Sequence, residues 1–564
     1  MRKRRSIAMA LTATLAVALA GSVPMASART DGRLREYVVQ YERGASVAEG
    51  RAAVRAAGGE VVDELVSIGA AKVLSRNQNF ILDAAADDAI AGAAQNRVIG
   101  YSDPALKEKV DDVEALSPTS PGRSSTVEVA EGAEPLADLQ WGNEMIDATV
   151  EGSYASQPGS ADVLVGIIDT GIDSTHPDLD DNVNTALSQN FTTDKPDIDG
   201  PCNQEPDKSC QDPATVDEGG HGTHVAGTVA AELNGLGIAG VAPGITLVNL
   251  RAGQDSGFFF LFETLAAYEY AAANGIDVVN MSFFTDPWWM NCRDNPLDSE
   301  EDQVEQATVI DLSNEALNQA WSSGVTLVSS AGNMHTDLGH PTYDAISPDY
   351  PEGTSYVRDN ITNECLVIPT EGDHVMSISA LGPSGRKAYY SDYGVEQITV
   401  SAPGGDRRDF FGTPQYNTPG TRILSSYPAD LAKEEGLISG DFRPRNPLAV
   451  VDCVGQGGAR TCGVYVYLQG TSMASPHVTG VAALIVSEFG SGSGAGFGMS
   501  PAAVEERLRS TATNHGCPSP RLFVYPDLVG ADPNVPFEAY CQGGIGFNGF
   551  YGEGIVNALD AVTP

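Results

Sequence analysis

The sequence predicts an α/β fold with a mainly parallel sheet flanked by helices, preceded by a small α+β unit. From about Trp141 onward, short apolar runs recur, and helical patterns lie between several of them. Runs that are apolar on both faces and alternate with helices are typical of a parallel sheet covered on both sides. The runs are VLVGIID, ITLVNL, DVVNMSF, VTLVSSAG, VMSISA and ITVSAPG, and the clearest helical patterns are FETLAAYEYAAANG and NEALNQAWSSG.

The smaller unit is predicted from the stretch that ends near Tyr101. REYVVQYERG and AAKVLS have strand patterns, while ASVAEGRAAVRAAGG and NFILDAAADDAIAGAAQN have helical ones. Residues 102–139 follow, and their Pro-, Ser-, Gly- and Glu-rich part predicts an exposed linker of the kind that proteases cut. Four insertions rich in Asp, Pro and Gly are expected to be surface loops, at about 285–310, 335–372, 405–460 and 515–545.

Residues 1–28 have the pattern of a secretory signal peptide. A basic region, Arg2 to Arg5, precedes an apolar stretch, and Ala26-Ser27-Ala28 is a small-residue cleavage pattern. A membrane anchor is the alternative, but the apolar stretch is short for a span and the cleavage pattern favours removal. No later segment reaches the length of a membrane-spanning helix, so we expect a secreted, extracellular protein without a membrane anchor.

The net charge argues against several partners. Removing the four cations of the signal takes the formal net charge from −42 to −46. So acidic a surface repels nucleic acid and anionic membranes, and it favours solubility, with tolerance of salt or bound cations as a further possibility.

The eight cysteines predict disulfides, because the chain is expected to be exported. Metal binding is the weaker interpretation, since the sequence has no C-x-x-C. Spacing does not determine connectivity, so the pairing is a hypothesis based on short loops. The hypothesis pairs Cys202 with Cys210, Cys453 with Cys462, Cys517 with Cys541 and, as the remainder, Cys292 with Cys365.

One candidate catalytic residue ends a predicted strand, and another begins a predicted helix after two glycines. Asp169 ends the run VLVGIID, so the fold would place its carboxylate at the carboxyl end of a strand, where active groups gather in such sheets. A simple cap of the next turn is the alternative role. His221 opens a helix behind two glycines, and His224 follows one turn later. The absence of H-E-x-x-H argues against zinc there, and we interpret His224 as a packed core histidine.

Two further candidates complete a set of catalytic parts. Asn333 ends VTLVSSAGN, where alone it would be an ordinary turn residue. Ser472 begins a helix that tolerates Pro476 in its first turn, and Gly470 allows close backbone approach. Ser472 would be the nucleophile, with His221 as base and Asp169 to orient it. Asn333 and the Ser472 backbone N–H would bind the oxyanion.

The chain order Asp, His, Ser is neither that of the α/β-hydrolases nor that of chymotrypsin, and it is the order given for subtilisin. IIDTGIDSTHPDL, GGHGTHVAGTVA, SSAGN and GTSMASPHVTGVAAL resemble the four signature blocks of the subtilisin-like serine proteases, peptidase family S8. The ending GEGIVNALDAV is similar to the closing helix of that family. The resemblance implies a subtilase α/β domain at 140–564 that hydrolyses peptide bonds through an acyl-enzyme on Ser472.

The resemblance extends less specifically to the small unit. Residues 29–101 resemble the inhibitory, chaperone-like and ferredoxin-like propeptide of the family, which implies a zymogen that cuts itself within 102–139. We therefore expect protein or peptide substrates, its own propeptide as an intramolecular inhibitor, no nucleic-acid partner and a monomer. No cofactor is required for the chemistry.

One departure concerns the substrate-binding edge. After Asn-Met-Ser the family usually continues with Leu-Gly-Gly, whereas here Ser282 is followed by Phe283 and Phe284. Ordinary aromatic packing under a loop is one interpretation. The other is that one ring points toward the substrate and narrows a specificity pocket, because edge glycines leave room that phenylalanine does not.

Structural calcium is a second implication of the resemblance. Asp178 lies in HPDL, and Asn234 lies in ELNGLGIAG at the spacing from His221 of a family calcium loop. Their oxygens suit Ca²⁺, although the companion N-terminal ligand has no secure match. A solvated acidic turn is the alternative.

The leading hypothesis is therefore a secreted, self-processed serine endopeptidase. A processing protease of narrow specificity is an alternative that the changed edge at 283–285 mildly favours. A catalytically silent binding protein is a third possibility, which the complete set of Asp169, His221 and Ser472 disfavours.

Overall fold

A computed structural model describes residues 33–101 and 133–564, apart from 197, 205–207, 285–286, 349–354, 456–459, 493–495 and 530–535. The predicted signal peptide and residues 102–132 of the predicted linker lie outside the described residues. Within the described part, Leu136 is buried and the Leu136 N–H donates to the Gly237 carbonyl. The last residues before 140 therefore pack on the larger domain.

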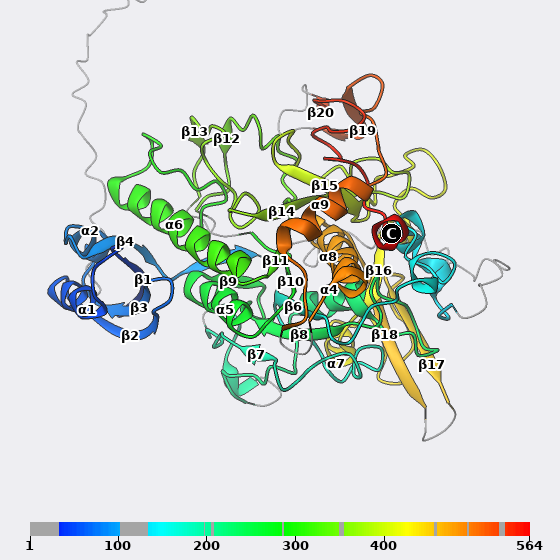
Figure 1. The fold of residues 1–564 in the computed structure, drawn as a ribbon, viewed down its shortest axis with the longest axis horizontal. Coiled ribbons are helices and arrows are strands. Elements are labelled where there is room, and N and C mark those ends of the chain that lie inside the picture. The colour runs from blue at the N-terminus through cyan, green and yellow to red at the C-terminus, as the bar shows by residue number, and fades with distance from the viewer. Residues whose placement is uncertain are drawn as a thin grey trace, which may run out of the picture.

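The larger domain is built on a parallel sheet in the order β15-β14-β11-β10-β6-β8-β7 (Figure 1). Every strand pairing in it is parallel. All six predicted apolar runs are strands of this sheet, which confirms the predicted fold class. The strands are β6 (Leu164–Asp169), β7 (Gln189–Asn190), β8 (Thr246–Arg251), β10 (Val278–Met281), β11 (Thr326–Ser330), β14 (Val375–Leu381) and β15 (Ile398–Pro403).

Helices cover both faces of the sheet, and the alternation of side chains along β6 shows why. Val165 and Ile167 join the core beneath α4 and α8, while Ile168 joins the core beneath α5 and α6. Successive strand residues face opposite sides, so a strand buried on both sides must be apolar throughout. The helices are α3 (Trp141–Met145), α4 (His221–Ala230), α5 (Leu261–Ala273), α6 (Glu300–Ser322), α7 (Ala429–Glu434), α8 (Thr471–Phe489), α9 (Pro501–Thr511) and α10 (Ala558–Val562).

The N-terminal unit is a separate antiparallel sheet in the order β2-β3-β1-β4, lying beside α5 and α6 (Figure 1). Its element order, βαββαβ, is that of a ferredoxin-like fold. The elements are β1 (Arg35–Tyr41), α1 (Val47–Ala56), β2 (Gly59–Leu65), β3 (Ala70–Ser75), α2 (Phe80–Ala85) and β4 (Ile90–Gln95), followed by β5 (Val98–Tyr101).

Two expectations for this unit were wrong. The helix expected over 79–96 ends at Ala85, and Ile90–Gln95 forms strand β4 instead. The strand β2 was not expected at all. The sequence IAGAAQ favours a helix locally, but β4 pairs along β1 and packs against α6. Tertiary pairing therefore outweighs the local helix propensity.

The expectation of surface loops was also wrong in part of each of the four insertions. Ser299 and Asp302 form a capping box, so α6 begins inside the first insertion. The second carries β12 (Tyr343–Asp344) and β13 (Arg358–Asp359). The third carries β16 (Ile423–Ser426) and β17 (Ala449–Val454), which flank β18 (Thr461–Leu468) in an antiparallel sheet. The fourth forms the hairpin of β19 (Leu522–Val529) and β20 (Pro536–Tyr540).

All four hypothesised disulfides are present: Cys202–Cys210, Cys292–Cys365, Cys453–Cys462 and Cys517–Cys541. The pairing by shortest loops succeeded because three of the bridges close local turns or hairpins, which left one possible partner for Cys292. Among the described residues, no helix combines the length and the apolar content that crossing a bilayer requires.

Two histidines lie in the core between the helices of one sheet face. The His224 ring contacts the Val466 carbonyl at 3.0 Å, as expected of a packed core histidine, and His477 contacts the Met473 carbonyl at 2.7 Å. Burial lowers the pKa of His224 to about 3 and that of His477 to about 4. Both rings are therefore neutral in the folded protein at neutral pH.

These histidines predict acid sensitivity. The pKa of His477 in the folded state, about 4, lies below the ordinary 6.5, so between these values the unfolded chain binds the extra proton. The free energy of unfolding then falls as pH is lowered from 6.5 to 4. In a Ser472→Ala background, His477→Gln should reduce that slope by up to about 1.4 kcal/mol per pH unit. Urea unfolding at several pH values measures it, and an unchanged slope contradicts the prediction.

Candidate functional site

Asp169 and His221 meet where the carboxyl end of β6 reaches the amino end of α4. His221 Nδ1 lies 2.7 Å from Asp169 Oδ1, and both side chains are buried. Gly222 permits this approach, because a Cβ on it would lie 2.1 Å from the Gly171 carbonyl oxygen. Donation from Nδ1–H to the carboxylate fixes the tautomer in which Nε2 is the basic nitrogen.

A second buried carboxylate, Asp217, holds this junction in place. Asp217 Oδ1 accepts from Thr170 Oγ1 at 2.9 Å and from the Gly220 N–H at 2.8 Å. Asp217 Oδ2 accepts from the Thr223 N–H at 2.8 Å and from its hydroxyl at 2.6 Å. The carboxylate thus satisfies N–H groups at the amino end of α4, and it ties this end to the residue after Asp169.

Ser472 lies in the first turn of α8, facing the end of β10. Its hydroxyl donates to the Ser282 carbonyl at 3.2 Å, and the Ser282 hydroxyl donates to the Ser472 carbonyl at 2.9 Å. Asn280 anchors this contact, since its Oδ1 accepts from Ser475 Oγ at 2.8 Å and from Thr479 Oγ1 at 2.9 Å. Proton transfer to His221 requires the Ser472 hydroxyl to turn away from the Ser282 carbonyl.

Asn333 follows β11 and is oriented by the residue before the serine. Asn333 Oδ1 accepts from the Thr471 N–H at 2.9 Å and from its hydroxyl at 3.0 Å. Because the amide oxygen accepts both hydrogen bonds from Thr471, the amide NH₂ points away from Thr471. Ser472 N–H, in the first turn of α8, lacks an intrahelical acceptor. The structure therefore brings the predicted nucleophile and the predicted oxyanion donor to neighbouring positions.

The two phenylalanines of the predicted substrate edge are both buried. The ring of Phe283 stacks on that of Phe259 in β9 (Phe258–Phe260), with centroids 4.2 Å apart. Phe284 is 8% exposed and belongs to an apolar cluster with Trp289, Met290 and the Cys292–Cys365 disulfide. Met334, the neighbour of Asn333, packs against the same cluster. The cluster therefore adjoins the loop that carries the predicted oxyanion donor.

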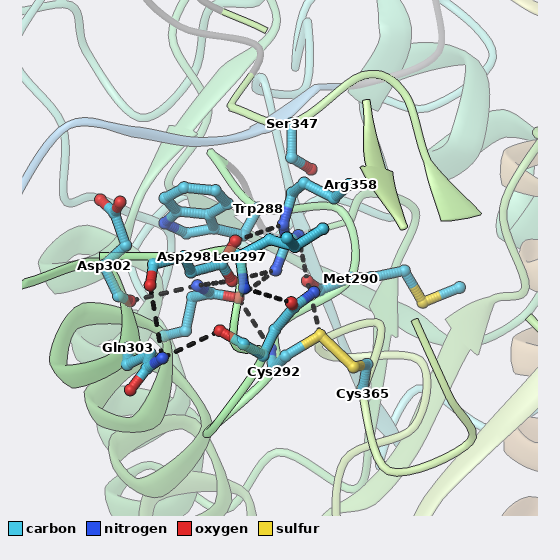
Figure 2. A network of polar contacts seen from close by, with 12 residues as sticks. Trp288, Met290, Cys292, Leu297, Asp298, Asp302, Gln303, Ser347, Arg358 and Cys365 are labelled. Carbon is cyan, nitrogen blue, oxygen red and sulfur yellow. Dashed lines mark hydrogen bonds and ion pairs between the residues drawn. A yellow bond between two sulfur atoms is a disulfide. The ribbon is translucent and has the colours of Figure 1, made fainter. Parts of the chain in front are cut away.

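A buried arginine supports this cluster (Figure 2). Arg358 is fully buried, and it donates to Asp298 with its Nε at 3.0 Å and its Nη2 at 2.6 Å. Its Nη1 donates to the Met290 carbonyl at 2.8 Å and to Asp344 Oδ2 at 3.0 Å. The guanidinium also lies 4.8 Å from the ring centre of Trp288. One cation thus joins the two insertions that carry Cys292 and Cys365.

The predicted calcium ligands lie on adjacent loops, and the structure adds a third group. Asp178 is buried, and its Oδ2 accepts from Tyr465 OH at 2.9 Å and from the Ile238 N–H at 3.1 Å. Asn234 is exposed, and its Oδ1 accepts from the Leu236 N–H at 2.9 Å. Glu134 accepts from the Gly235 N–H in the same loop. Burial and neighbouring carboxylates raise the pKa of Asp178 to about 8.

Two of the three groups at the predicted calcium site have oxygens that could bind a cation. Among the described residues, Asp178 Oδ1 and Glu134 Oε2 are buried without a hydrogen-bond partner. Carboxylate oxygens of this kind suit Ca²⁺. The amide oxygen of Asn234, by contrast, is already bonded to the backbone. Asp178 and Glu134 are therefore better candidate calcium ligands than Asn234.

The N-terminal unit lies against the helices beside the predicted substrate edge. Glu305 of α6 accepts from the Gln95 N–H at 3.0 Å and pairs with Arg97, and Glu263 of α5 pairs with Lys72. Both glutamates are buried. Strand β5 pairs antiparallel with β9, so residues 98–101 add a strand beside Phe258–Phe260.

Comparison with known proteins now decides the family. The model of the subtilase family, peptidase S8, matches residues 160–524, which is more than half of the chain. The chain belongs to the subtilase family. It is accordingly a serine-type endopeptidase by homology, and the family resemblance of the sequence motifs is confirmed.

Individual relatives agree with this assignment. Subtilisin DY from Bacillus licheniformis is 28% identical over 358 residues, covering 63% of this chain and 85% of the relative. Fervidolysin from Fervidobacterium pennivorans is 28% identical over 458 residues, covering 77% of this chain but only 50% of that protein.

Solved structures share the fold. The epidermin leader peptide processing serine protease from Staphylococcus aureus superposes with a TM-score of 0.59 at 20% identity, covering 94% of this chain and 99% of that one. The crystal structure of fervidolysin gives a TM-score of 0.52 at 23% identity, covering 94% and 61% respectively.

Proposed function

We propose that the chain is a secreted subtilase zymogen whose mature part hydrolyses peptide bonds through an acyl-enzyme on Ser472. The observation that carries the proposal is the buried 2.7 Å contact between His221 Nδ1 and Asp169 Oδ1 at the end of the strand next to β10. Secretion is supported by the signal pattern of residues 1–28 and by the four disulfides, which persist in oxidising compartments.

The proposed reaction forms an acyl-enzyme on Ser472 and then hydrolyses it. Ser472 Oγ attacks the carbonyl carbon of the scissile bond while its proton passes to His221 Nε2. The carbonyl oxygen becomes an oxyanion, which accepts hydrogen bonds from the Asn333 amide and the Ser472 N–H. The intermediate then expels the amine, which takes the proton from His221. Water repeats the sequence on the ester and regenerates the serine.

In this proposal residues 29–101 are the inhibitory propeptide. Strand β5, at the end of this unit, pairs antiparallel with β9, whose Phe259 stacks on Phe283 of the predicted substrate edge, so the unit is anchored next to that edge. Glu263 and Glu305 favour the bound unit, because its Lys72 and Arg97 supply charges that partner these buried carboxylates. We assign the maturation cut to residues 102–132, since residues just beyond them pack on the mature domain.

Ser472→Ala tests the proposal with two readouts. Hydrolysis should fall by several orders of magnitude, about the loss found when a triad member is removed. The variant should also accumulate as a precursor that lacks only residues 1–28. An organophosphonate should label Ser472 alone in the unaltered protein, as intact mass and peptide mapping will measure. Labelling of another serine, or normal processing of the variant in a protease-deficient host, contradicts the proposal.

A narrow-specificity processing protease is a second candidate, and the cluster around Phe284 favours it. Phe284, Trp289 and the Cys292–Cys365 bridge fill the space beside the Asn333 loop with large apolar groups. We expect a substrate site beside this cluster to accept small or medium side chains near the scissile bond better than large aromatic ones. The acidic surface adds a preference for basic residues further out, which fades as salt rises.

Phe284→Gly should therefore raise kcat/KM for substrates with bulky side chains more than for substrates with small ones. Phe284→Ala is a milder version, in case glycine loosens the fold. Phe283→Ala is the matched control, because that ring stacks on Phe259 in the other core cluster and should change stability rather than preference. Profiling with a peptide library measures all three. An identical profile before and after the Phe284 substitutions would show that the ring is only packed.

Structural calcium at Asp178, with Glu134 as a further ligand and Asn234 at the rim, is proposed from the unpaired carboxylate oxygens. A ligand that binds only the folded state stabilises it by mass action. In the Ser472→Ala background, calcium should raise the Tm and a chelator should lower it, and Asp178→Asn should reduce the difference. Asp173→Asn, on the neighbouring turn, is the control. The same Tm with calcium and with chelator contradicts the site.

A further inference from the structure

The turn that follows Asn333 is held by hydrogen bonds from one segment, residues 390–392. Asp392 donates its N–H to the Gly332 carbonyl at 2.9 Å, and its Oδ1 accepts from the Thr336 N–H at 2.7 Å. The His335 N–H donates to the Tyr390 carbonyl at 2.7 Å. These contacts bracket Asn333 on both sides, so the position of its backbone depends on them.

His335 is the point at which the C-terminal hairpin touches this turn. Its backbone is left-handed, with φ of +58°, and its ring stacks on Phe537 of β20 with centroids 3.9 Å apart. The ring also lies edge-on to Tyr525 of β19 at 5.3 Å. His335 Nε2 lies 3.0 Å from the Glu538 carbonyl, and Nδ1 faces the Tyr389 carbonyl. The ring is thus enclosed between the hairpin and segment 389–393.

A disulfide and a buried tyrosine hold the hairpin in place. The Cys517–Cys541 disulfide closes its base. The Tyr525 hydroxyl donates to the Lys387 carbonyl at 3.1 Å, and the Lys387 ammonium lies 5.7 Å from the ring centre of Tyr525. Burial lowers the pKa of His335 to about 3, so the ring is neutral at neutral pH and donates to one carbonyl at a time. The ring is therefore held by stacking together with one hydrogen bond.

We propose that the β19–β20 hairpin, acting through His335, positions Asn333 in the oxyanion hole. His335 is two residues from Asn333 and does not contact the reacting atoms, so it is a positioning residue rather than a catalytic one. Thr471 orients the Asn333 amide from the nucleophile side, and the hairpin fixes the turn from the other side. The inference rests on the proposed role of Asn333 and extends it to a part of the chain more than 180 residues away.

Loosening this turn should weaken stabilisation of the transition state and leave substrate binding unchanged. Binding of substrate along an extended edge does not use Asn333, whereas the oxyanion does. Loosening the turn should therefore lower kcat and leave KM nearly unchanged. The loss should be smaller than the roughly 10²–10³ that follows from removing an oxyanion donor, on the order of tenfold.

Two variants of the processed enzyme test this from opposite sides of the contact. His335→Asn removes the ring and keeps a residue that tolerates positive φ. Phe537→Ala removes the stacking partner and leaves His335 intact. Tyr540→Ala is the matched control, because this aromatic residue of β20 has an exposed side chain. Each of the three substitutions is also combined with Asn333→Ala. For every variant, kcat, KM and the Tm are measured, and kcat is expressed per active site. The number of active sites is determined by end-point phosphonate labelling.

We expect both test variants to lose kcat about tenfold with KM within about twofold, and Tyr540→Ala to keep both. In the Asn333→Ala background the same substitutions should cause no further loss of kcat, since their effect passes through that amide. Equal losses in both backgrounds, or an unchanged kcat with His335→Asn, overturn the inference while leaving the proposed function intact. Full kcat in Asn333→Ala alone overturns the oxyanion role itself.

Discussion

The contact between the imidazole of His221 and the carboxylate of Asp169 sets the geometry on which the rest of this molecule depends. A buried carboxylate is costly unless it is hydrogen-bonded, so the amino end of α4 must lie against the end of β6. Small residues make that possible, because Gly222 approaches Gly171 more closely than any side chain permits. Asp217 then satisfies the amino end of the helix, and the parallel sheet delivers Ser472 to the same edge through β10 and α8.

Much of this could be predicted from the sequence, because the relevant signals are local. The apolar strands, the glycines before His221 and the residues at each strand end are contiguous patterns, so Asp169, His221, Asn333 and Ser472 were found together. Asp217 and Asn280 were not, although each bonds to several groups of the site. An aspartate two residues before a pair of glycines and a helix is a capping signal that was available. Asn280 lies within an apolar strand and gives no sign of its partners on α8.

The failures of prediction have a different origin. Strand β4 has a composition that favours a helix, and only its pairing with β1 makes it a strand. The four insertions have loop compositions, yet they contain buried clusters and antiparallel pairs that depend on residues far along the chain. Arg358 illustrates this, since its partners Asp298 and Asp344 come from two insertions and neither is adjacent in sequence. Long-range polar pairing of this kind leaves no periodic signal.

Three of the four disulfides involve the insertions or the residues just beyond them. The central core is large and apolar, and none of its seven strands carries a bridge. A cross-link limits the conformational freedom of the unfolded chain and so favours the folded form of the segments that it joins. Two of these disulfides lie near the loop that carries Asn333: the Cys292–Cys365 pair belongs to the cluster around Phe284, and the Cys517–Cys541 pair closes the base of the hairpin that packs on His335. The parallel sheet thus brings Asp169, Asn333 and the end of β10 to one edge, and the disulfide-linked segments pack beside the Asn333 loop.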